Sequence, residues 1–94
     1  MSTIGSQTAT LAPVATSTTV ATLLASAASK KMVHIFNDSA GKLYVCYGVG
    51  ASATNFTVLL AAGGYYETPS GFPYSGIITG ILDTGTGTAR ITSY

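Results

Sequence analysis

The chain carries very little charge. Only seven of its 94 residues are Lys, Arg, Asp or Glu, and the formal net charge is +1. A nucleic-acid-binding protein needs a basic patch to neutralise phosphates. Four scattered cations against three acids argue against such a partner. Little electrostatic repulsion keeps copies of this chain apart, which suits a protein that works inside an assembly.

Cysteine and long apolar runs are also scarce. Cys46 is the single cysteine, so an intrachain disulfide and a disulfide-stapled secreted scaffold are excluded, and folding in a reducing cytoplasm fits. No run of about 18 apolar residues occurs, so no membrane-spanning helix is expected. Residues 19–28 end in small residues but follow no basic residue, so we expect no cleaved signal peptide.

Hydroxyl and apolar side chains are abundant instead. Serine and threonine number 25, and 47% of the residues are hydrophobic, which separates the chain from disordered proteins of low hydrophobicity and high net charge. A chain of this length forms one domain and buries only about 60–65% of its unfolded surface. Help from neighbouring molecules is therefore plausible.

Short β-branched and aromatic runs alternate with Gly, Pro, Asn and Asp. About seven strands with turns every 8 to 12 residues are typical of a small antiparallel β-sandwich or barrel, and no amphipathic helix is expected. The expected strands are 17–24, 31–36, 43–47, 56–60, 65–68, 77–82 and 89–92.

Residues 1–16 are expected to form an extended N-terminal arm, and 17–94 a single β-sandwich domain. The arm has no charged residue and no clear periodicity, and it contains Pro13. Either it adds a strand to the sheet edge of a neighbouring molecule, or it is a disordered tail.

Two hairpins are predicted from the turn residues. Strands 31–36 and 43–47 flank the turn 37–41, which contains Asn, Asp, Ser and Gly, while Asp83 begins a glycine-containing turn between 77–82 and 89–92.

Several expected strands are apolar on both faces. In 43–47, Tyr44 and Cys46 point away from the side shared by Leu43, Val45 and Tyr47. A second apolar face indicates burial against a partner, and the six tyrosines favour this interpretation. Ordinary core packing with scattered exposed apolar residues is the alternative.

The sequence Ile81-Leu-Asp-Thr-Gly85 spells the signature of an aspartic protease. Such an enzyme needs two of these loops and a flap, and only 11 residues follow Asp83, too few to build the site. We therefore interpret Asp83 as a turn residue.

No other catalytic or cofactor site is predicted. His34 and Cys46 lie on strands expected to pair, but no acid is placed to orient the histidine, and one His and one Cys are too few for zinc. Residues 48–56 are glycine-rich but lack the Gly-Lys-Ser/Thr ending of a phosphate loop. Glu67 either pairs with a cation or is solvated. We expect no enzyme activity, metal, cofactor or small-molecule substrate.

The order of short motifs over residues 33–92 resembles small virion proteins of tailed bacteriophages. The resemblance rests on overall order, ending in a Thr-Gly-x-Ala-x-Ile-Thr segment. The earlier motifs are Asn-Asp-Ser at 37–39, Leu-Tyr-Val at 43–45, Gly-Ala-Ser-Ala-Thr at 50–54, Phe-Thr-Val at 56–58 and Gly-Tyr-Tyr-Glu at 64–67.

This resemblance implies a β-sandwich structural subunit of the virion, assembled in the host cytoplasm. The expected function is that of a head decoration (cement) protein, which associates with itself, with a trimer favoured, and with the major capsid protein or another virion protein. The alternative is a neck, tail or fibre component, including a carbohydrate- or host-binding module whose aromatic side chains stack on sugars. The expected partner contacts are Ile4, Leu11, Val14, Tyr44, Tyr65, Tyr66, Phe72 and Tyr74.

Overall fold

The computed structural model describes residues 9–26, 32–68 and 75–93. This part of the chain contains strands and no helix. The strands are β1 (Thr10–Thr16), β2 (Ala21–Leu24), β3 (Val33–Asp38), β4 (Leu43–Tyr47), β5 (Val58–Leu60), β6 (Tyr65–Glu67), β7 (Ile78–Leu82) and β8 (Gly87–Ser93).

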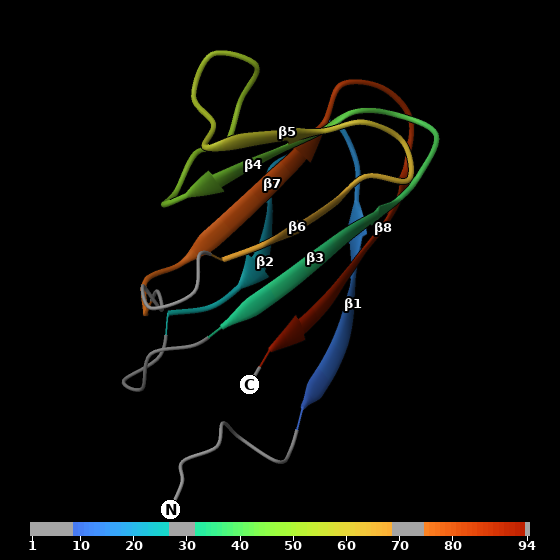
Figure 1. Ribbon diagram of the computed structural model, residues 1–94. Helices are drawn as coiled ribbons and strands as arrows, with labels where there is room; N and C mark the ends of the chain where they lie inside the picture. The colour runs from blue at the N-terminus through green and yellow to red at the C-terminus, as the bar shows by residue number, and fades with distance from the viewer. Residues whose placement is uncertain (1–8, 27–31, 69–74, 94) are drawn as a thin grey trace, which may run out of the picture.

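The strands form two antiparallel sheets of four strands each (Figure 1). Sheet A has the order β1-β8-β3-β6, and sheet B has the order β2-β7-β4-β5. The sheets pack on each other through a shared apolar core. The predicted fold class, a small all-β antiparallel sandwich, is confirmed.

The core is built by alternate residues of the central strands, because successive side chains of a strand point to opposite faces. β3 and β8 contribute from sheet A, and β4 and β7 from sheet B, while the edge strands β2 and β5 add Leu23 and Leu60. Full burial of one such side chain stabilises the fold by about 1.5–3 kcal/mol. The core side chains are Leu23, Val33, Ile35, Leu43, Val45, Leu60, Ile78, Leu82, Ala89 and Ile91.

Asn37, at the end of β3, connects the two sheets through a fully buried side chain. Its Nδ2 donates to the carbonyl oxygens of Gly41, Leu60 and Ala61 at 2.9, 3.1 and 3.0 Å, and its Oδ1 accepts from Ser39 Oγ at 2.7 Å. Because Leu60 belongs to sheet B, the Asn37 amide joins the sheets as well as the turn that follows β3. A turn role for this residue was expected, but its contact across the sandwich was not.

Residues 10–16 correct the predicted boundary of the N-terminal arm. They are extended, as expected, but they form β1 and pair along their whole length with β8 of the same chain. Pro13 is tolerated there because β1 is an edge strand, where a missing N–H breaks no ladder bond. The first half of the predicted arm, residues 1–8, lies outside the described residues.

Neither predicted hairpin forms. β3 pairs with β8 and β6, while β4 pairs with β7 and β5, so the connections β3–β4 and β7–β8 both cross from one sheet to the other. The two crossing loops lie together, because Asp83 N–H donates to Lys42 O at 3.0 Å. Turn residues revealed where the chain reverses but not which sheet it enters next.

Candidate functional site

Asp83 is exposed at the end of β7, and its carboxylate serves the neighbouring loop. Its Oδ1 accepts a hydrogen bond from the Lys42 backbone N–H at 2.8 Å. Gly85, two residues later, has a φ of 73°, a conformation that favours glycine. Asp83 is therefore a turn residue, as expected, although the turn links two sheets instead of forming a hairpin.

His34 and Cys46 lie on opposite sides of the sandwich. His34 is on the outer face of sheet A, whereas Cys46 is on the outer face of sheet B, buried to 7% exposure. The Cys46 thiol lies near Asn55 Nδ2, at 3.8 Å, and Val49 O, at 4.0 Å. The two residues therefore cannot act as a nucleophile and base pair.

Within the described ranges, no three His, Cys, Asp or Glu residues come together as metal ligands. No pocket is found over this part of the chain either. Candidate sites must therefore be sought on the surface, and the outer faces of the two sheets are the largest regular surfaces that the fold presents.

The outer face of sheet A carries a mixed set of aromatic and charged side chains, here called the polar face. Strand register places Arg90, Phe36 and Tyr65 in one row across β8, β3 and β6, and His34 beside Glu67 in the next row. Tyr65 is 53% exposed and Phe36 is 38% exposed. The polar face consists of His34, Phe36, Asp38, Tyr65, Glu67 and Arg90.

Side-chain contacts hold the polar face in order. The Tyr65 hydroxyl donates to Glu67 Oε1 at 2.9 Å and lies 2.7 Å from His34 Nδ1. The Tyr65 hydroxyl has one proton, which it donates to Glu67. In the contact with His34, the proton is therefore supplied by His34 Nδ1–H and accepted by the Tyr65 hydroxyl oxygen.

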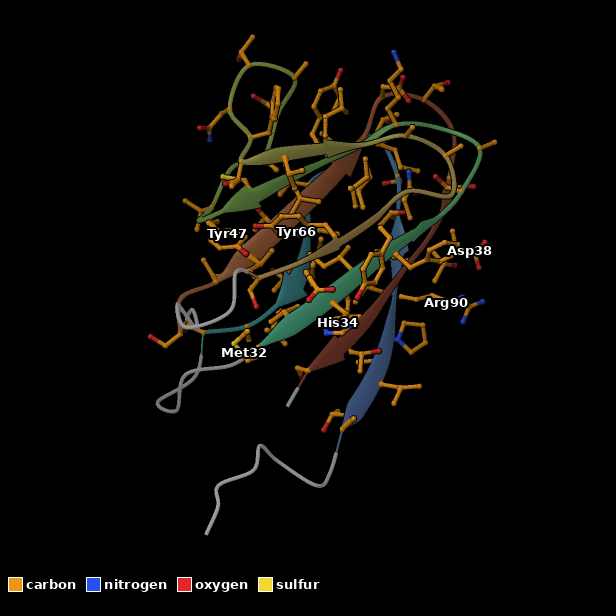
Figure 2. The ribbon with its side chains drawn as sticks, in the orientation of Figure 1. Met32, His34, Asp38, Tyr47, Tyr66 and Arg90 are labelled. Carbon is orange, nitrogen blue, oxygen red and sulfur yellow. The ribbon has the colours of Figure 1, made fainter. Side chains whose placement is uncertain are left out.

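On the same face, Arg90 Nε and Asp38 Oδ2 form an exposed ion pair at 2.8 Å; Figure 2 shows these two side chains together on one side of the molecule.

The outer face of sheet B carries an uncharged group of side chains, here called the apolar row. Register places Leu59, Tyr44 and Ile81 side by side across β5, β4 and β7. The ring of Phe56 packs on Tyr44 at a centroid distance of 5.1 Å. Leu59 and Phe56 are 41% and 43% exposed. The apolar row (Phe56, Leu59, Tyr44 and Ile81) is therefore partly covered by itself and otherwise open.

The part of the outer face of sheet B around Cys46 and Thr79 is covered by the loop between β4 and β5. Thr79 Oγ1 donates to Gly48 O at 2.6 Å and accepts from Ala51 N–H at 3.3 Å. Ala51 of this loop and Cys46 of β4 are both buried. The chain thus shields the part of this face around Cys46 itself and leaves Phe56 and Leu59 of the apolar row exposed.

The residues predicted as partner contacts do not form one surface. Tyr44 belongs to the apolar row and Tyr65 to the polar face. Tyr66 points inward, because it alternates with Tyr65, and its hydroxyl lies 3.0 Å from the Tyr47 hydroxyl across the sandwich (Figure 2). Leu11 is 73% exposed on β1, and Val14 packs against the core.

The predicted contacts Ile4, Phe72 and Tyr74 lie outside the described residues. Phe36, Leu59 and Phe56 are further exposed apolar side chains that the prediction did not name. Strict alternation with the buried neighbours Ile35 and Leu60 was the signal that could have placed Phe36 and Leu59 on outer faces.

No family model, curated protein or solved structure matches this chain. The described ranges contain no helix long and apolar enough to span a membrane.

Proposed function

We propose that this chain is a non-enzymatic structural protein of a tailed-bacteriophage particle, a decoration protein that binds the head shell and stabilises it by bridging subunits. The proposal combines the motif order of residues 33–92 with the chemistry of one outer face. The observation that carries it is the apolar row on sheet B.

The apolar row has the composition of the centre of a protein interface. Such centres are enriched in aromatic residues and depleted of charge, and Leu59, Tyr44 and Phe56 fit that description on an open sheet surface. Lys42 comes just before β4 and Asp83 just after β7, at the end of the sheet where Tyr44 and Ile81 lie. Polar groups therefore border the apolar row as they border an interface.

Each copy binds weakly, and many copies stabilise the shell together. The surface of four side chains is small compared with the roughly 800 Å² of surface area that each partner buries in a stable interface. Self-association, with a trimer favoured, lets one oligomer place several apolar rows on the same shell. This raises the overall affinity for the shell without new kinds of contact. The near-zero net charge allows such crowding.

The proposal is tested by measuring co-sedimentation of the purified protein with expanded shells of the phage that encodes it, and its solution mass by light scattering. The wild-type protein is expected to be an oligomer and to saturate the shells at a fixed stoichiometry. Leu59→Asp is expected to weaken shell binding by at least about tenfold, because it buries a charge in an apolar contact.

Leu11→Asp is the matched control, since Leu11 is even more exposed but lies on β1 of the other sheet. It is expected to bind shells like the wild type. A truncation that tests the arm should remove residues 1–8 only, because removing 1–15 also deletes most of β1. A stable monomer that ignores the shells, or equal binding by both Asp variants, would contradict the proposal.

A further inference from the structure

The Tyr65 ring on the polar face is held in a fixed position. Its hydroxyl reaches Glu67 and His34, which lie one row further along the sheet, and residues two apart on a strand are about 6.8 Å apart. The tyrosine side chain spans this gap, so its ring lies along the sheet surface instead of standing out from it. The His34 ring meets it edge-on, at 83° and 5.6 Å.

The Tyr65 side chain is accessible from the outer face of sheet A, since the residue is 53% exposed. Because two hydrogen bonds already fix the ring, a ligand that stacks on it loses little side-chain entropy on binding.

Hydrogen-bonding groups surround this ring at the spacing of sugar residues. Strands in a sheet lie about 4.8 Å apart, so the row Tyr65–Phe36–Arg90 extends about 10 Å across three strands, room for one to two pyranose rings. Arg90 uses Nε in its ion pair with Asp38, and the Nη groups of the same planar guanidinium carry further donors.

From this arrangement we propose that the polar face binds a neutral oligosaccharide of hexopyranose units. The C–H face of one sugar ring stacks on Tyr65 and the edge of Phe36. The sugar hydroxyls exchange hydrogen bonds with the Arg90 guanidinium and with the carboxylates of Asp38 and Glu67. This binding function does not rest on the proposed role in a phage head.

The charges of the face select among ligands. Asp38 and Arg90 compensate each other, and Glu67 leaves the face slightly negative, which disfavours an acidic polysaccharide. A protein partner fits less well, because the charged groups that ring Phe36 and Tyr65 are those depleted from the centres of protein interfaces. The apolar row on sheet B matches such a partner better.

The test is titration of ¹⁵N-labelled protein with cellohexaose, maltohexaose, mannohexaose and, as the acidic probe, hexagalacturonate. At least one neutral hexasaccharide is expected to bind with a Kd of about 1 mM or tighter. The amide shifts are expected on β3, β6 and β8, and hexagalacturonate is expected to bind at least about tenfold more weakly. No neutral binding up to about 10 mM, or shifts confined to sheet B, overturns the proposal.

Variants separate stacking from other effects. Tyr65→Ala is expected to lower the affinity by about tenfold or more, because it removes the aromatic face. Tyr65→Phe keeps the aromatic ring but removes the hydroxyl that bonds to His34 and Glu67, so the ring is no longer held in place. It is expected to lower the affinity by only about threefold. Val49→Ala, at a side chain 71% exposed in the loop over sheet B, is the control and should bind like the wild type. Unchanged affinity in folded Tyr65→Ala overturns the proposal.

Discussion

The two outer faces of the sandwich differ in chemistry, although both sheets have four antiparallel strands and share one core. The polar face of sheet A holds an ion pair and a hydrogen-bonded tyrosine, all exposed. The apolar row of sheet B is uncharged and adjoins a surface that the chain covers with its own loop. A surface rich in fixed hydrogen-bonding groups suits a soluble polar ligand, whereas an uncharged apolar one suits burial against protein.

This difference arises from single positions in otherwise similar strands. β3 alternates Ile35 and Asn37 in the interior with Phe36 and Asp38 outside, while β4 alternates Leu43 and Val45 inside with two apolar residues outside. The inner residues determine stability, and the outer ones determine what each face can bind.

The largest effect is expected from Asn37→Ala, which should destabilise both sheets together. The change leaves three buried or half-buried carbonyl groups without the Asn37 amide, at a cost of about 3 kcal/mol or more. That is a large share of the free energy of unfolding of a typical domain, which is about 5–15 kcal/mol. Urea unfolding followed by tyrosine fluorescence measures the loss.

Ser39→Ala serves as the control for this variant. It removes one hydroxyl that bonds Asn37 Oδ1 and Gly41 but leaves the contacts across the sandwich, so about 1 kcal/mol is expected. A loss below about 1 kcal/mol in Asn37→Ala would show that the sheets are held together by the apolar core alone.

The next effect is confined to sheet B. Thr79→Val keeps the side-chain shape but leaves Gly48 O and Ala51 N–H without the Thr79 hydroxyl, costing about 1–2 kcal/mol. The loop should then open more often, and Cys46 should react with a thiol reagent about tenfold faster.

Thr22→Val is a matched control on the neighbouring strand, because Thr22 is exposed and lies opposite Thr79 in the β2–β7 register. In Thr22→Val, the Cys46 thiol should react at the wild-type rate. Equal rates in both variants would mean that the loop does not depend on Thr79.

A smaller effect is expected on the polar face. Arg90→Ala breaks an ion pair whose side chains are 59% and 46% exposed, so the free energy of unfolding should change by no more than about 0.5 kcal/mol. Affinity for the neutral hexasaccharide should nevertheless fall, by about threefold. Lys42→Ala, an exposed cation away from this face, should change neither quantity. A large loss of stability in Arg90→Ala would assign the ion pair a structural role instead.

The smallest effect is the response of shell binding to salt. Because the apolar row has no charged side chain, raising NaCl from about 0.05 to about 0.5 M should change the shell affinity by less than about twofold. A fall of tenfold or more would place the contact on the polar face and remove the distinction drawn between the two faces.

The candidate surfaces were predictable only in part. Tyr44 and Tyr65 were predicted as partner contacts, and both lie on outer faces. Tyr66 was grouped with Tyr65, although it faces inward toward Tyr47. Composition alone does not tell which of two adjacent tyrosines is outside. That depends on the phase of the strand relative to the core, which is set by packing against the other sheet.

Local chemistry in the chain was sufficient to locate most of the strands, but not β1, which was expected to be part of an arm. The β-branched and aromatic runs at 43–47 and 77–82, and the glycines and Asp83 between them and their neighbours, follow from short-range conformational preferences. Those same preferences say nothing about partners distant in sequence.

Pairing was settled by packing between distant segments. Whether the residues after Asp38 return to the same sheet or cross about 10 Å to the opposite one depends on where apolar side chains can be buried. The same burial draws residues 10–16 onto β8 as an edge strand, and it joins His34, Tyr65 and Arg90 into one face. Side-chain period is a property of the strand, but the neighbours of each side chain are a property of the whole fold.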